Sequence, residues 1–197
     1  MSPPADALRS IEPQVEPEQM SMRVANVIHD DPAVSMPRID EGANKAALAE
    51  FPAAVIVVTC WGNNGAPVGA TPSSCGSLSI NSPLMFAAFD RGSATLKALS
   101  TPGKRFLIHL MSEGQERAAL MLASKGPDKF HQVVCRQTRY GPQIANCAQV
   151  FPCAVQALVP AGDHVIVTGA VHGLEEDGIR QPLLHHRREL YAVPARA

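Results

Sequence analysis

The chain has 197 residues, of which 46% are hydrophobic and 18% charged, and a formal net charge of −1. These values fit one domain with a real core and exclude a wholly disordered chain. There is no excess of basic residues and no apolar run near the ~20 residues that span a bilayer, so we expect no nucleic-acid and no membrane partner. The N-terminus has no positive start followed by an apolar core, which predicts a cytoplasmic protein without a signal peptide.

The cysteines indicate free thiols. They number five and form no C-x-x-C pair, whereas a metal site or a disulfide framework usually shows paired spacing. The adjacent His185 and His186 would point to opposite faces of a strand, so they cannot easily share one metal. We therefore expect no metal site, and thiols in a reducing cytoplasm. The cysteines are Cys60, Cys75, Cys135, Cys147 and Cys153.

The chain divides into an arm and a domain. Residues 1–38 carry many prolines among acidic residues. Proline removes a backbone donor and restricts the residue before it, so this segment cannot form long regular structure. We predict an N-terminal arm or tail over residues 1–38, either disordered or wrapped around a partner subunit, and one folded domain over residues 39–197.

The domain reads as short strands with few helices. Apolar runs rich in β-branched residues are bounded by Gly, Asn, Pro and Ser, as buried strands are. This pattern favours an antiparallel barrel over a doubly wound sheet. Helices are expected at residues 40–50, 93–100 and 113–124, and strands at 55–61, at 67–71 continuing through 77–80, and at 84–90, 105–111, 153–160 and 164–171. Residues 128–134 are expected to be irregular or a short helix, and a last segment covers residues 182–191.

Two loops rich in hydroxyl residues suit an anionic ligand. The first holds Thr71, Ser73 and Ser74, and the second holds Ser93 and Thr95. Hydroxyls and backbone N–H groups both donate to phosphate oxygens, and a capped helix start favours an anion. The alternative is an ordinary turn in the first loop and a plain helix cap in the second. Arg91, beside the second loop, would add charge at a phosphate or would be a solvated turn residue.

Six short stretches, in order, resemble the flavin reductase-like family. The resemblance as a whole covers roughly residues 44–192. The family usually has asparagine where His109 stands, and a Tyr-His pair where this chain has a His-His pair. The matching stretches are Phe51-Pro52 before the run at 55–59, residues 67–74 (PVGATPSS), 90–95 (DRGSAT), 125–130 (KGPDKF), 162–164 (GDH) and 182–187 (PLLHHR).

The resemblance implies both fold and activity. The fold would be mostly β with flanking helices, a Greek-key-like antiparallel split β-barrel of the FMN-binding type. The activity would be that of an NAD(P)H:flavin oxidoreductase, in which NADH or NADPH delivers a hydride to FMN or FAD. The family implies a homodimer with flavin near the subunit interface, and reduced flavin that diffuses to a separate flavin-dependent monooxygenase.

The resemblance also extends the expected site. Lys129 and Phe130, with the neighbouring Lys125, would lie near the flavin or its adenylate tail. His164 would position the nicotinamide, and His186 and Arg187 would orient it or cap the dimer interface. Because hydride transfer needs little acid–base machinery from the protein, no residue is assigned as certainly catalytic.

Two other functions remain open at this point. The chain could hold flavin tightly as an electron carrier or sensor without turning over NAD(P)H. It could also be a non-catalytic barrel whose proline-rich arm binds a partner. Flavin binding and anaerobic bleaching by NADH distinguish the three functions.

Overall fold

The computed structural model describes residues 39–126, 128–176, 178 and 180–194. The chain divides into two units, Met1–Asp40 and Glu41–Ala197, and only the second is considered below. The predicted arm at residues 1–38 lies outside the described residues. Among the described residues, no helix is long and apolar enough to cross a membrane.

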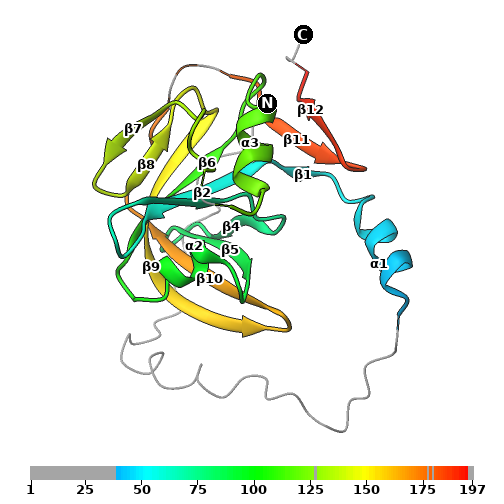
Figure 1. The fold of residues 1–197 in the computed structure, drawn as a ribbon, viewed down its shortest axis with the longest axis horizontal. Coiled ribbons are helices and arrows are strands. Elements are labelled where there is room, and N and C mark those ends of the chain that lie inside the picture. Colours follow the sequence, from blue (N-terminus) through cyan, green and yellow to red (C-terminus); the bar gives the residue numbers. More distant parts are fainter. Residues whose placement is uncertain (1–38, 127, 177, 179, 195–197) are drawn as a thin grey trace, which may run out of the picture. The chain divides into compact units, whose positions relative to one another are not determined.

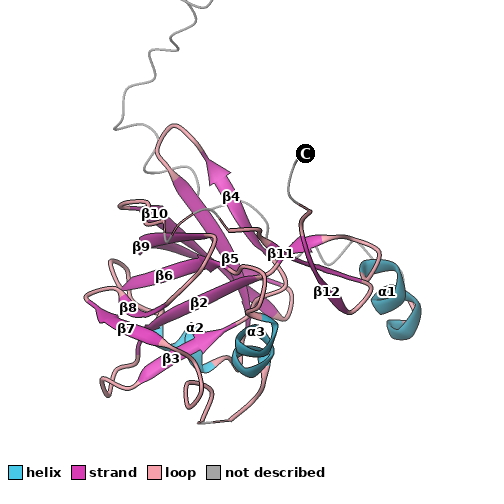
Figure 2. Ribbon diagram, turned by 90° about the horizontal axis from the view of Figure 1, so that it is seen from above, coloured by secondary structure: helices cyan, strands magenta, loops and turns pink. Residues whose placement is uncertain are grey.

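The fold is mostly β, with three short helices in the described part of the chain (Figures 1 and 2). A seven-stranded antiparallel sheet with the order β3-β2-β6-β9-β10-β5-β4 curls into a half-barrel, accompanied by a three-stranded sheet β1-β11-β12 and the hairpin β7-β8. The elements are α1 (Glu41–Leu48), β1 (Ala53–Ala54), β2 (Ile56–Trp61), β3 (Pro67–Ala70), β4 (Cys75–Ser79), β5 (Leu84–Asp90), α2 (Ala94–Ala98), β6 (Arg105–Leu110), α3 (Glu116–Ala123), β7 (Cys135–Thr138), β8 (Gly141–Ile144), β9 (Gln149–Ala161), β10 (His164–Val171), β11 (Leu183–His186) and β12 (Glu189–Ala192).

Strand β2 is buried on both faces, which explains its unbroken apolar sequence. Side chains alternate across a strand, and Ile56 and Val58 enter one core cluster while Val57 enters the other. The first cluster fills the barrel and is closed by α2, which supplies Leu99 from its C-cap. The second lies under α3, which contributes Leu122, and under the hairpin β7-β8.

The expectation of one strand from residue 67 through residue 80 is wrong. The segment forms two strands at opposite edges of the seven-stranded sheet: β3 pairs with β2, and β4 pairs with β5. Pro72 cannot donate to a ladder, and residues 71–74 cross from one edge of the sheet to the other. This break places the hydroxyl-rich loop across an end of the barrel.

The hairpin β7-β8 was not predicted from the sequence, because its strands are short and mostly polar. It packs tightly on β2. Gly141 has φ +147°, and a Cβ added there would lie 2.9 Å from the Cα of Cys60. The last segment folds as the hairpin β11-β12, with Arg187 and Arg188 at positive φ in the turn.

The five cysteines are free, as expected. Burial raises the pKa of Cys75 and of Cys153 to about 12. Both thiols therefore stay protonated at neutral pH and serve as small apolar side chains of the barrel core. In the described ranges, no three His, Cys, Asp or Glu side chains gather into a possible metal site.

Candidate functional site

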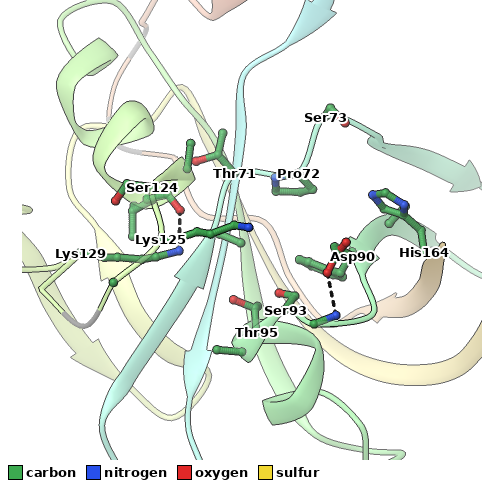
Figure 3. Close-up of a pocket in the computed structure, with 18 residues that line it drawn as sticks. Thr71, Pro72, Ser73, Asp90, Ser93, Thr95, Ser124, Lys125, Lys129 and His164 are labelled. Carbon is green, nitrogen blue, oxygen red and sulfur yellow. Dashed lines mark hydrogen bonds between the residues drawn. The ribbon is translucent and has the colours of Figure 1, made fainter. Parts of the chain in front are cut away.

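A pocket of about 630 Å³ opens where residues 71–74, the end of β5, the start of α2 and the segment after α3 meet (Figure 3). This volume is in the range of cofactor and substrate sites. The two hydroxyl-rich loops, distant in sequence, form neighbouring walls of it. The lining residues are Ala70, Thr71, Pro72, Ser73, Ala88, Phe89, Asp90, Gly92, Ser93, Ala94, Thr95, Leu122, Ala123, Ser124, Lys125, Gly126, Lys129 and His164.

The loop after β5 is held in shape by its own hydrogen bonds. The carboxylate of Asp90 accepts from the backbone N–H of Gly92 at 2.7 Å, and the Asp90 carbonyl accepts from the N–H of Ser93 at 2.9 Å. Ser93 is the N-cap of α2, and its hydroxyl accepts from the N–H of Leu96 at 3.4 Å. These hydrogen bonds fix the conformation of the turn, which presents the small side chains of Ser93 and Ala94 to the pocket.

Thr95 brings a hydroxyl to the pocket lining. The residue is only 1% exposed and lines the pocket, yet its hydroxyl makes no hydrogen bond with any residue that the structure describes. Its oxygen is not among the fully enclosed side-chain polar atoms of the described residues that lack a partner, so it is open to the pocket. Thr71 differs, because its hydroxyl donates to the Ala119 carbonyl at 2.8 Å and so ties the first loop to α3.

Two lysines form the opposite wall (Figure 3). The ammonium group of Lys129 donates to the carbonyls of Gly69 at 3.3 Å and of Leu122 at 3.1 Å. An ammonium group has three donors, so one remains for a ligand. Burial lowers the pKa of Lys129. Lys125 lines the same wall, so the pocket holds two ammonium groups and no ion pair of the described residues neutralises them.

His164 stands on the side of the pocket away from the lysines (Figure 3). It opens β10, directly after the turn at Gly162, and its Nδ1 lies 2.6 Å from an oxygen of Asp163. This hydrogen bond lowers the pKa of the Asp163 carboxyl. Arg91 fixes the same turn, because its Nε and Nη2 donate to the Gly162 carbonyl at 3.1 and 2.9 Å.

The structure gathers most of the predicted site residues but not all of them. Thr71, Ser73, Ser93, Thr95, Lys129 and His164 line the pocket. The others lie outside its lining. Ser74 is exposed. Phe130 packs on Gly69, because a Cβ added to Gly69 would lie only 3.0 Å from the Cζ of Phe130.

His186 and Arg187 also lie outside the pocket lining, in the hairpin β11-β12. The Arg187 guanidinium makes a two-pronged ion pair with Glu50, in which Nη2 lies 2.7 Å from Oε2. This pair lowers the pKa of Glu50 and raises that of Arg187. The backbone N–H of Arg187 donates to the Ala49 carbonyl. In this chain, Arg187 therefore fastens the end of α1 to the hairpin, and its part in nicotinamide binding stays a prediction.

Sequence reasoning missed Pro72, Asp90 and Ser124 in the pocket. Asp90 and Ser124 end secondary-structure elements, where a polar residue is usually a cap or a turn residue, so neither carries a signal of its own. Only their position in the sequence, next to predicted ligand residues, could have identified two of them as pocket residues. Pro72 lies between predicted ligand residues, and Asp90 precedes the second hydroxyl-rich loop.

The donor set fits a flavin. A flavin nucleotide joins a flat, largely apolar ring to an anionic phosphate. The pocket offers an apolar surface from Pro72, Ala88 and Ala94. It also offers cations and hydroxyls that donate to phosphate oxygens, with the Thr95 hydroxyl unused by the described protein. Small residues along the turn after β5 leave room for the ligand to approach the backbone closely.

Comparison with known proteins gives the class of this molecule. Residues 48–194 match the model of the flavin reductase like domain. The chain belongs to the flavin reductase-like family, and the predicted family, split-barrel fold and enzyme class are confirmed.

Individual relatives share about a third of their residues with this chain. A protein from Pseudomonas putida named flavin reductase is 32% identical over 76% of this chain and 88% of its own length. Another from Kitasatospora aureofaciens, named flavin reductase (NADH), is 32% identical over 79% of this chain and 83% of its own. By contrast, the chain spans 45% of a "Probable flavin reductase" from Rhizobium meliloti, to which it is 33% identical.

The fold matches solved structures of the same kind. The NADH:FAD oxidoreductase SgcE6 of Streptomyces globisporus superimposes with a TM-score of 0.72 and 26% identity, over 83% of this chain and all of that one. The flavin reductase PheA2, at 22% identity and a TM-score of 0.70, shows the same fold.

Proposed function

We propose that the chain uses NADH or NADPH to reduce FMN or FAD in the pocket between the two hydroxyl-rich loops, and that the reduced flavin passes to a separate flavin-dependent oxygenase. The observation that carries the proposal is the pocket itself, which combines two lysines, an apolar surface and a Thr95 hydroxyl that bonds to no described residue. The relatives' names support the oxygenase partner, since one of them is the reductase subunit HsaB of a flavin-dependent monooxygenase of Mycobacterium tuberculosis.

Each wall has a separate task in this proposal. The hydroxyls of Ser93 and Thr95 and the free donor of Lys129 hold the flavin phosphate, because charge-assisted hydrogen bonds to phosphate are strong. Pro72, Ala88 and Ala94 exclude water from one face of the ring. When bound, the flavin supplies the hydride acceptor, and the protein supplies orientation.

His164 positions the nicotinamide on the open side of the pocket. Its ring is oriented by the hydrogen bond between Nδ1 and Asp163, and Arg91 holds the turn that carries both residues. Such a residue fixes the geometry of hydride transfer and takes no proton itself. The family resemblance further leads us to propose a homodimer, in which a second subunit completes the surroundings of the flavin.

The test is a flavin titration followed by kinetics. Binding of FMN and FAD is measured by fluorescence quenching, and oxidation of NADH and NADPH is then followed at the near-ultraviolet band with each flavin. We expect saturable binding and oxidation that depends on added flavin. Absence of flavin-dependent oxidation with both nicotinamides would refute the reductase. Yellow cofactor that survives dialysis but is not bleached by NADH would instead support the electron carrier.

A further inference from the structure

A second hollow, of about 540 Å³, adjoins the pocket at the turn after β5. Gly92, Ser93 and Ala94 line both the pocket and this hollow. A ligand long enough to pass over the turn would occupy both at once. The other residues of the hollow are Arg91, Leu96, Lys97, Ser100, Leu158 and Val165.

The hollow combines apolar walls with a polar, cationic rim. Leu96 is buried, and Leu158 and Val165, from the neighbouring strands β9 and β10, are half-buried against the barrel core. Lys97 and Ser100 are exposed at the rim. Within the described part of the chain, the Lys97 ammonium makes no ion pair.

These features fit an adenylate. A purine is flat and weakly polar on its faces, so it packs well on aliphatic side chains, while its phosphate favours nearby cations and hydroxyls. FAD consists of FMN and AMP joined through their phosphates. If the flavin phosphate lies at Ser93, the second phosphate lies at the turn that the two hollows share.

Resting on the proposed function, we infer that the hollow lined by Lys97, Leu158 and Val165 binds the AMP half of FAD. The chain is then a reductase that binds FAD more tightly than FMN, because only FAD fills both hollows. The residues that determine this preference are outside the flavin pocket, at Lys97 and Ser100.

Two variants test the inference. Lys97→Glu reverses the charge at the rim, and Ser100→Trp fills the hollow with a large side chain. Both positions are exposed, so the fold should persist, and thermal melting of each variant checks this. Lys104→Glu is the matched control, since Lys104 lines neither hollow.

The readout is the dissociation constant of FAD and of FMN, measured by fluorescence quenching without turnover. We expect each variant to raise the dissociation constant of FAD about tenfold, the size of one lost charge-assisted contact. The dissociation constant of FMN should change less than about twofold. The control should change neither. Free AMP should compete with FAD in the wild-type protein and fail to compete with FMN.

Three outcomes would overturn the inference. An equal loss of affinity for FAD and for FMN would show that the substitutions act on the flavin pocket. Unchanged binding of both flavins would show that the hollow takes no adenylate of FAD. A higher KM for NADH with unchanged flavin binding would assign the adenylate to the nicotinamide dinucleotide. In each case the wild-type protein still binds and reduces flavin, whereas failure of the proposed function shows as a wild-type protein that does neither.

Discussion

Two pairs of like residues show how the barrel wall and the pocket differ. Thr59 and His109 lie where β2, β6 and β8 meet, and Thr95 and His164 line the pocket. In the wall, the Thr59 hydroxyl donates to the Pro142 carbonyl at 2.6 Å. In the pocket, the Thr95 hydroxyl finds no partner among the described residues.

The two histidines differ in the same way. His109 Nδ1 donates to the Val57 carbonyl at 3.1 Å, and its Nε2 accepts from the N–H of Ile144 at 3.1 Å, so both ring nitrogens are used within the protein. His164 uses Nδ1 toward Asp163, while among the described residues its Nε2 has no partner. The side chains of Thr59 and His109 are thus bonded within the protein, whereas those of Thr95 and His164 keep hydrogen-bonding capacity for a ligand.

The largest expected effect comes from Gly141, which allows the hairpin β7-β8 to reach β2. Its φ of +147° disfavours any side chain, and an added Cβ would meet the Cys60 backbone at 2.9 Å. Gly141→Ala should therefore lower the free energy of unfolding by about 4 kcal/mol, from backbone strain and overpacking together. Urea denaturation measures it. Gly173→Ala, with no atom within 4 Å of an added Cβ, is the control and should stay within about 0.5 kcal/mol of wild type.

His109 should make the wall sensitive to acid. Burial lowers its pKa from 6.5 to about 4, so the unfolded chain takes up a proton before the folded one. The stabilisation is fully present above pH 6.5 and is lost as the pH falls toward 4. The shift corresponds to about 3 kcal/mol.

Urea midpoints across this pH range measure the effect. His109→Asn removes the titrating group and should remove this part of the slope. An unchanged slope in the variant would show that other groups cause the acid sensitivity.

In the pocket, Thr95→Val should leave the fold intact and weaken the binding of flavin. Valine has nearly the shape of threonine but no hydroxyl, and this hydroxyl bonds to no described residue. We expect flavin to bind about tenfold less tightly, from loss of one hydrogen bond to phosphate, with the melting temperature almost unchanged. Thr59→Val is the matched comparison: it should lower the melting temperature and leave flavin affinity alone. The reverse pattern would contradict the division between wall and pocket.

The smallest effect is expected at Arg187, which was predicted to orient the nicotinamide or cap the dimer interface and which the structure pairs with the exposed Glu50. Exposed ion pairs contribute little to stability. Arg187→Gln should leave both stability and the KM for NADH nearly unchanged. A clear rise in that KM would show that the arginine binds nicotinamide.

Sequence patterns determined much of the architecture. The run at residues 55–61 and the repeated turn residues predicted an antiparallel barrel, because apolar alternation and turn chemistry are local properties. The hydroxyl-rich loops were recognised for the same reason, since Ser and Thr next to Gly and Pro indicate turns whose donors face outward.

Only the tertiary structure decided how these pieces meet. The break at Pro72 sends β3 and β4 to opposite edges of one sheet, and this crossing carries residues 71–74 over the barrel end. The hairpin β7-β8 depends on contacts of Gly141 and Pro142 with β2, far away in sequence. The local pattern marked both Thr71 and Thr95 as ligand residues, and only long-range hydrogen bonding separates them, because the Thr71 hydroxyl donates to the Ala119 carbonyl.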